Sequence, residues 1–292
     1  MLQQRYTFFY CCGTINPLFF QDIFISTIFA LLNRYELPKQ KLNMDNILPD
    51  TFIHSYMLTA GESDATAHMP LTLLVERVIE VATEHANTLG IGYSTLVKQN
   101  MGWVLCRISI EMKRYPEINE QYALTTWIES YNRRFSLRNM HITGGDGSII
   151  GYVRTVWAAI DFDTRTMADL TSLPRDSFPT AALPCPIEVA PRLPEVPFDA
   201  SFMAYTFRFC DLDFNRHVNT VRYVALLLNQ WPLSHYDTCE ASRFDIFFKH
   251  ECHFGEQVDV ATYTSDTLGS ICNILHQGTS MVEARFRWSP RQ

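Results

Sequence analysis

Apolar residues recur at helical spacing in two stretches of the chain. In the first stretch they lie three or four positions apart, on one face of a helix: Leu71, Leu74, Val75, Val78 and Ala82. His85 continues this apolar face and is predicted to be a core histidine, while Gly90 and Gly92 predict the end of the helix. The second stretch, TVRYVALLLNQW at 220–231, is followed by Pro232, which predicts the end of a second helix.

Short segments rich in β-branched and aromatic residues accompany each helix and predict strands. In the first half these segments are 51–59, 102–115, 121–143 and 148–162, and the sequence GGDGS supplies a hairpin turn between the last two. In the second half they are 202–209, 244–252, 257–265, 270–278 and 280–288. A long helix followed by antiparallel strands, found twice, predicts an α+β fold built from two similar units.

A proline-rich segment separates the two units. Residues 172–200 hold seven of the fourteen prolines, and proline disfavours both helix interiors and central strands. The predicted organisation is therefore an N-terminal unit at 46–171, an extended linker at 172–200 and a C-terminal unit at 201–292. Residues 1–45 are predicted to be an extension outside the fold, either disordered or upstream of a native start at Met44.

Composition and charge exclude several classes of protein. With 47% hydrophobic residues the chain is typical of a globular protein, and its net charge of −7 argues against general nucleic-acid binding. The clean apolar run Ile23–Leu32 is shorter than the roughly 20 residues that span a bilayer, so no stable membrane insertion is expected. The eight cysteines are scattered without a CxxC pair, which favours reduced thiols and a cytoplasmic protein.

The segment CDLDFNRHVN, Cys210–Asn219, concentrates polar residues just before the second helix. Asn219 is a suitable N-cap for that helix, and an acid is favoured near a helix N-terminus. These roles do not account for Asp213, Asn215 and His217 at alternate positions. Residues two apart in an extended loop point the same way, so these three side chains are predicted to line one side of the helix entrance.

Two motifs resemble the acyl-acyl-carrier-protein (acyl-ACP) thioesterases: DLDFNRHVNTVRYV at 211–224 and FKHECHFGEQV at 248–258. In the first unit the most similar stretch is GWVLCRISIEM at 102–112. The resemblance implies a double hotdog, in which each unit is a long helix wrapped by an antiparallel sheet. It also implies hydrolysis of fatty acyl-ACP, with the acyl chain held by the N-terminal unit and the chemistry carried out by the C-terminal unit.

The resemblance also assigns the catalytic residues. The family's D-x-N-x-H spacing falls on Asp213, Asn215 and His217, and its glutamate falls on Glu251. Thioester hydrolysis needs a nucleophile and a group that stabilises the oxyanion. We expect Glu251 to act as general base on water, and Asp213 either to orient that water or to attack. Asn215 and His217 would fix Asp213 by hydrogen bonds, and N–H groups at 218–220 would polarise the carbonyl.

Other chemistries in this region have weaker support. Cys252, with His217 as base and Asn215 as orienter, could form a thiol site, but the adjacent Glu251 would disfavour a thiolate. His250 and Cys252 could share one face of a strand as metal ligands, yet no second cluster in the sequence has metal-like spacing. We therefore expect neither a metal nor a cofactor.

The predicted partner is acyl-carrier protein, an acidic protein that presents the acyl chain on a phosphopantetheine arm. Basic residues near the site are expected to meet it: Arg133, Arg134, Arg138, Arg216 and Arg222. An acyl-CoA thioesterase of the same fold and a non-catalytic acyl-binding hotdog protein are the alternatives. Because single hotdogs pair and a tandem chain supplies both partners, we expect a monomer or a homodimer.

Overall fold

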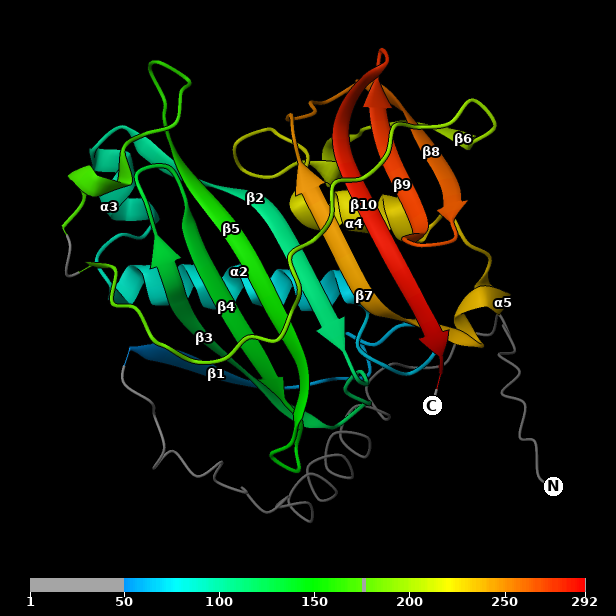
Figure 1. Cartoon of the computed structure of the whole chain (residues 1–292), viewed down its shortest axis with the longest axis horizontal. Helices are drawn as coiled ribbons and strands as arrows, with labels where there is room; N and C mark the ends of the chain where they lie inside the picture. Colours follow the sequence, from blue (N-terminus) through cyan, green and yellow to red (C-terminus); the bar gives the residue numbers. More distant parts are fainter. Residues whose placement is uncertain (1–49, 175–176, 292) are drawn as a thin grey trace, which may run out of the picture. The chain divides into compact units, whose positions relative to one another are not determined.

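The computed structural model describes residues 50–174 and 177–291. These residues lie in one compact unit, Ile47–Gln292, and the extension predicted at 1–45 lies outside them. The unit is an α+β structure, in which helices pack against an antiparallel sheet of ten strands (Figure 1). None of the helices in the described ranges is long and apolar enough to cross a membrane.

The order of elements is the same in the two halves. The N-terminal half contains β1 (Thr51–Met57), α2 (Leu71–Thr88), α3 (Tyr93–Lys98), β2 (Met101–Met112), β3 (Gln121–Tyr131), β4 (Ser136–Thr143) and β5 (Ile149–Asp161). The C-terminal half contains β6 (Ser201–Thr206), α4 (Thr220–Leu228), α5 (Leu233–Tyr236), β7 (Cys239–Phe248), β8 (Gln257–Ser265), β9 (Gly269–His276) and β10 (Thr279–Pro290). Short 3-10 turns lie at Leu170–Ser172 and Phe209–Asp211.

Both predicted helices are present, and local chemistry explains their ends. The five apolar residues that define the predicted face of α2 are all buried. Just after the end of α2, Gly90 has a φ of 73°, a backbone conformation that residues with a Cβ rarely adopt. At the start of α4, the Asn219 side chain accepts the N–H of Val221 at 2.9 Å, which confirms the predicted N-cap.

The segment 121–143 differs from its prediction as one strand. It forms the hairpin of β3 and β4, because the side chain of Asn132 accepts the backbone N–H groups of Arg134 (2.8 Å) and Phe135 (3.0 Å). An asparagine side chain that bonds its own backbone two and three residues further on favours a turn over a continuing strand.

The two halves share one sheet because β2 pairs with β7. The strand order is β1-β3-β4-β5-β2-β7-β10-β9-β8-β6. At the seam, the fully buried Asp245 accepts a hydrogen bond from Ser109 at 2.6 Å and forms ion pairs with Arg243 and Arg285 at 2.8 and 2.6 Å. A single buried carboxylate thus bonds residues from both halves.

The proline-rich linker crosses the face of the sheet opposite to α2 and α4 (Figure 1). Arg154 donates to the carbonyls of Cys185 (3.3 Å) and Ile187 (2.8 Å), and Arg243 donates to that of Glu188 (2.8 Å). The linker is therefore held by side chains from both halves of the sheet. Near its start, Leu173 and Phe178 instead pack in a buried cluster with Ala86 of α2.

Candidate active site

An apolar cavity of about 530 Å³ lies beside the loop that precedes α4. The C-terminal half contributes Asp213, Phe214, Asn215 and Thr220 to its lining. The N-terminal half builds most of the remaining wall, including Ile79, Ala82 and Ala86 from α2, Trp103 and Leu105 from β2, and Trp157 from β5. Its size and its mostly apolar walls with a few polar groups are typical of a small-molecule site.

The loop at 213–217 is a tight turn and not the extended segment that was predicted. Asp213 Oδ1 accepts the backbone N–H groups of Asn215 (2.8 Å) and His217 (3.2 Å), and the Asp213 N–H donates to the His217 carbonyl (2.8 Å). Arg216 has a φ of 65°, in the left-handed region. The backbone, and not the side chains, of Asn215 and His217 therefore holds Asp213.

This turn directs the four predicted catalytic residues to two neighbouring places. Asp213 and Asn215 line the cavity. His217 faces Glu251 instead, with 3.4 Å between His217 Nδ1 and Glu251 Oε1. The rings of His217 and His253 pack edge to face with their centroids 5.1 Å apart, and the two residues form an isolated antiparallel bridge. The structure thus brings His217 and Glu251 together and places Asp213 and Asn215 beside the cavity.

His217, Glu251 and His253 could hold a metal ion. One ligand atom from each residue lies within 4.8 Å of the others, and two imidazoles with one carboxylate form a ligand set used by catalytic zinc sites. Glu251 already has a cationic partner, because its Oε2 lies 3.0 Å from Arg165 Nη2. A metal ion at this place would compete with the guanidinium of Arg165.

The thiol of Cys252 takes no part in this cluster. Cys252 is fully buried in the hydrophobic core, and burial raises the pKa of its thiol. Its backbone N–H donates to the Tyr223 hydroxyl at 3.0 Å, and its carbonyl accepts the Val218 N–H at 2.9 Å. A raised pKa disfavours the thiolate that a nucleophile or a metal ligand needs, which argues against the thiol site and against the pairing with His250.

The start of α4 offers a backbone donor beside the cavity. The N–H groups of Val218 and Asn219 already donate to backbone carbonyls, at 2.9 and 2.8 Å, so neither is available to a substrate. Thr220 is the first residue of the helix, where an N–H has no intrahelical acceptor, and it lines the cavity. Of the N–H groups at 218–220 that were predicted to polarise the carbonyl, the N–H of Thr220 is the one that remains a candidate.

The arginines expected to meet the carrier protein have different environments. Four of them are exposed: Arg133, Arg134, Arg216 and Arg222. The prediction is wrong for Arg138, which is only 5% exposed and lines the cavity. Its neighbours two positions away on β4, Ser136 and Met140, are also buried. The strand alternation of β4 is therefore the signal that could have placed Arg138 inside the fold.

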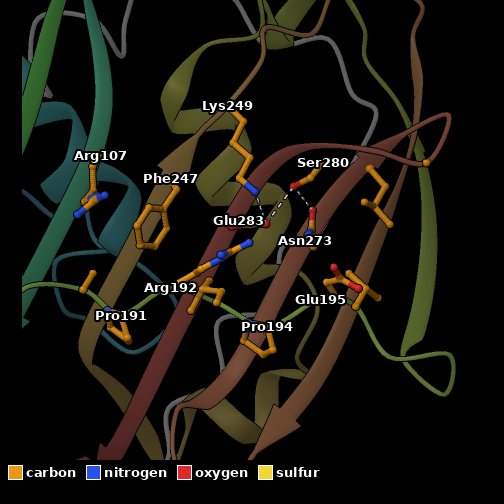
Figure 2. Close-up of a pocket in the computed structure, with 15 residues that line it drawn as sticks. Arg107, Pro191, Arg192, Pro194, Glu195, Phe247, Lys249, Asn273, Ser280 and Glu283 are labelled. Carbon is orange, nitrogen blue, oxygen red and sulfur yellow. Dashed lines mark hydrogen bonds and ion pairs between the residues drawn. The ribbon is translucent and has the colours of Figure 1, made fainter. Parts of the chain in front are cut away.

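A second cavity, of about 670 Å³, lies between the linker residues 191–196 and the sheet (Figure 2). Polar groups in it bond one another: Lys249 pairs with Glu283, and the Ser280 hydroxyl donates to Asn273 at 2.9 Å. None of the four predicted catalytic residues lines it. This cavity is therefore not the candidate active site.

Both halves match the models of one protein family. Residues 49–174 match the acyl-ACP thioesterase N-terminal domain, and residues 197–290 match the C-terminal domain. The chain is 26% identical over 258 residues to oleoyl-acyl carrier protein thioesterase 2, chloroplastic, of Arabidopsis thaliana. It is 24% identical over 266 residues to palmitoyl-acyl carrier protein thioesterase, chloroplastic, of Gossypium hirsutum. Each match covers 82% of this chain, and the chain spans 70% and 64% of those two proteins.

Solved structures show the same architecture. The acyl-ACP thioesterase from Bacteroides thetaiotaomicron aligns with a TM-score of 0.77 at 26% identity, over 82% of this chain and 98% of that chain. The 12:0-ACP thioesterase from Umbellularia californica aligns with a TM-score of 0.72 at 20% identity, over 84% of this chain and its own full length. The second similarity shows a common fold.

Proposed function

The chain belongs to the acyl-ACP thioesterase family, and from this premise we propose that it hydrolyses fatty acyl-ACP to a free fatty acid and carrier protein. The cavity is the observation that carries the proposal, because Asp213 and Asn215 lie beside an apolar space of about 530 Å³. Burial of an alkyl chain contributes roughly 0.8 kcal/mol per CH₂. The N-terminal half would therefore hold the acyl chain, and the loop before α4 would carry the chemistry.

We also propose that the fold is a double hotdog. In the N-terminal half the strands β1–β5 wrap α2, and in the C-terminal half the strands β6–β10 wrap α4. The repeated order of elements and the alignment with the bacterial thioesterase support this description. The boundaries at 46, 172 and 201, a cytoplasmic location, and a monomeric or homodimeric state stay predictions.

In the proposed reaction, Asp213 is the carboxylate beside the acyl thioester, because it lines the cavity and Glu251 does not. Asp213 orients a water molecule against the carbonyl carbon, and the proton of that water passes through His217 to Glu251, whose Oε1 lies 3.4 Å from His217 Nδ1. The Thr220 N–H stabilises the oxyanion. Collapse of the intermediate releases the phosphopantetheine sulfur, which takes up a proton, and leaves the fatty acid.

The carrier protein would dock on the surface beside the loop. Arg216 lies in the turn itself and Arg222 lies in the first turns of α4, and both are exposed. Opposite charges steer two proteins together and fix their register. An acidic carrier protein bound there would deliver its phosphopantetheine arm next to Asp213.

Two substitutions test the catalytic assignment. Asp213→Asn keeps an oxygen that accepts the turn's N–H groups, so it removes the charge and preserves the loop. Glu251→Gln likewise keeps an acceptor for His217. Because a positioned acid–base group contributes about 10²–10⁴-fold, we expect each variant to lower kcat on acyl-ACP by that factor with an unchanged melting temperature.

Asp146→Asn is the matched control, since the Asp146 side chain also accepts a backbone N–H in a turn, at 144–148. It should leave kcat unchanged. Near-normal kcat in both Asp213→Asn and Glu251→Gln would contradict the assignment. The same acyl chain should be assayed on CoA, because equal kcat/KM on CoA and on carrier protein would favour an acyl-CoA thioesterase. No hydrolysis of either substrate would favour a binding protein.

A further inference from the structure

Arg138 differs from the other buried arginines of the described residues. Three arginines are 4–5% exposed: Arg138, Arg243 and Arg285. The last two both pair with the carboxylate of Asp245, at 2.8 and 2.6 Å. Across the described ranges, Arg138 has no carboxylate within ion-pair distance. A buried cation without an anion destabilises the folded state. The presence of Arg138 at this position therefore calls for a ligand or a function that uses its charge.

In the described residues Arg138 forms hydrogen bonds with neutral groups. Its Nη1 lies 2.7 Å from His85 Nδ1 and donates to Thr126 Oγ1 at 3.2 Å. Burial, with a contribution from the Arg138 charge, lowers the pKa of His85 to about 4, so that His85 is a neutral acceptor at pH 7. Burial lowers the pKa of Arg138 to about 10, which still leaves it charged. Arg138 is therefore a buried positive charge that no carboxylate of the described residues neutralises.

Arg138 lines the cavity, and in the described residues Nη1 is the guanidinium nitrogen that has hydrogen-bond partners. Within the same described ranges Nε and Nη2 of Arg138 have no hydrogen-bond partner, and unlike Arg77 Nε they are not fully buried. An Nε–Nη2 edge is a planar fork that fits the two oxygens of a carboxylate. Arg285 shows this use, because its Nε and Nη2 bond Asp245 at 2.9 and 2.6 Å.

Arg138 lies well into the N-terminal half. It is on β4, and β5 separates β4 from β2, the strand that joins the C-terminal half. With a strand spacing of about 4.8 Å, two spacings correspond to roughly 10 Å. The cavity lining contributed by β2 and β5 is apolar and includes Leu105 and Trp157. An acyl chain that starts beside Asp213 would pass these side chains before its far end reached Arg138.

We propose that the free edge of Arg138 binds an oxygen acceptor at the end of the acyl chain remote from the thioester. The preferred substrate would then be an acyl-ACP with a terminal carboxylate or hydroxyl group. This inference rests on the proposed thioesterase function and adds the class of acyl chain. A plain methyl end would leave the charged fork without an acceptor inside an apolar cavity, which disfavours binding.

Turnover of three acyl-ACPs of equal chain length tests the proposal: unsubstituted, ω-hydroxy and ω-carboxy. Wild type should show a kcat/KM on at least one oxygenated chain that is on the order of 10- to 100-fold above the unsubstituted value. A preference for the carboxy chain identifies an anion as the ligand, and a preference for the hydroxy chain alone identifies a neutral oxygen. Wild type that prefers the unsubstituted chain would overturn the proposal.

Two substitutions of Arg138 link the preference to this side chain. Arg138→Met should reverse the preference, and Arg138→Lys, which keeps the charge without the planar fork, should reduce it. Arg287→Met removes an exposed arginine on β10 and should leave the ratio unchanged. An unaltered ratio in both Arg138 variants would also overturn the proposal.

A binding measurement separates this inference from the thioesterase assignment. Calorimetry compares the monomethyl ester of a dicarboxylic acid with the methyl ester of the unsubstituted acid, so that the ester takes the place of the thioester. Wild type should bind the carboxylate-bearing ester more tightly than the other ester, and Arg138→Met should not. If wild type binds both esters equally, and the ω-hydroxy methyl ester no more tightly, Arg138 is not an oxygen site, whatever the turnover. Selective binding without any turnover would reject only the thioesterase function.

Discussion

Among single residues, His85 makes the folded state sensitive to acid. Burial lowers its pKa from 6.5 to about 4. The unfolded chain therefore takes up a proton at a higher pH than the folded protein does, and stability is lost as the pH falls from about 6.5 to 4. A shift of this size corresponds to about 3 kcal/mol at full protonation.

The substitution His85→Gln tests this effect. Glutamine replaces the ring-nitrogen acceptor of His85 with an oxygen acceptor for Arg138 and does not titrate. The free energy of unfolding should therefore decline less between pH 7 and pH 4 than in wild type. Urea denaturation at pH 7, 5.5 and 4 measures the decline. His250→Gln, at an exposed histidine, should decline as wild type does. Parallel declines in wild type and His85→Gln would show that His85 does not titrate during unfolding.

The sequence predicted His85 correctly and Arg138 incorrectly, for a physical reason. A histidine on the apolar face of a helix has one simple explanation, because the 3.6-residue repeat fixes which face is buried. An arginine is mostly exposed in proteins unless it is paired, so three neighbouring arginines at 133, 134 and 138 suggested one basic surface. The turn at Asn132 and the start of β4 separate them, and only Arg138 points inward.

Among elements, α4 depends on the cap at its first turn. The Asn219 side chain accepts the Val221 N–H at 2.9 Å and begins the helix at Thr220, the residue beside the cavity. Asn219→Ala should lower the free energy of unfolding by about 1 kcal/mol in urea denaturation, because a helix N–H loses its acceptor. Asn219→Asp, which keeps the oxygen, should stay close to wild type.

Asn229→Ala at the other end of α4 is the matched control. There the cap bonds of the helix involve the backbone N–H of Asn229, which alanine retains. If Asn229→Ala lowers the free energy of unfolding as much as Asn219→Ala does, the loss does not come from the side-chain acceptor at the N-cap. Equal stability of Asn219→Ala and wild type would show that packing alone holds the first turn.

Helices and strands followed from the sequence better than the turns did. Apolar spacing and caps placed α2 and α4, since both signals are local. The conformations predicted for 121–143 and 213–217 were wrong for the same reason. The side chains of Asn132 and Asp213 each accept backbone N–H groups two or more residues further on. Such bonds fold an apparently extended segment into a turn. At 213–217 this moves His217 from the side of Asp213 to the side of Glu251.

At the scale of the whole molecule, the described unit is held together where β2 meets β7. The pairing joins residues 107–111 to residues 243–247, a separation at which local sequence patterns carry no information. The sequence therefore predicted two units but not the strands that join them. Because the two halves share a continuous sheet, we expect them to unfold in one cooperative transition.

Asp245 is the residue on which this joint depends. Burial alone would raise the pKa of its carboxyl, but hydrogen bonds from Arg243 and Ser109 and the charge of Arg243 outweigh burial and lower it. Asp245→Ala would leave the buried guanidinium of Arg285 without its carboxylate and Arg243 with Glu111 as its carboxylate partner. Breaking a buried pair in this way costs about 3–5 kcal/mol. Urea denaturation should show that loss as one shifted transition, while Asp259→Ala, at an exposed position on β8, should unfold as wild type does. A curve that splits into two steps would instead mean that each half is stable alone, so that the seam positions the loop before α4 without stabilising either half.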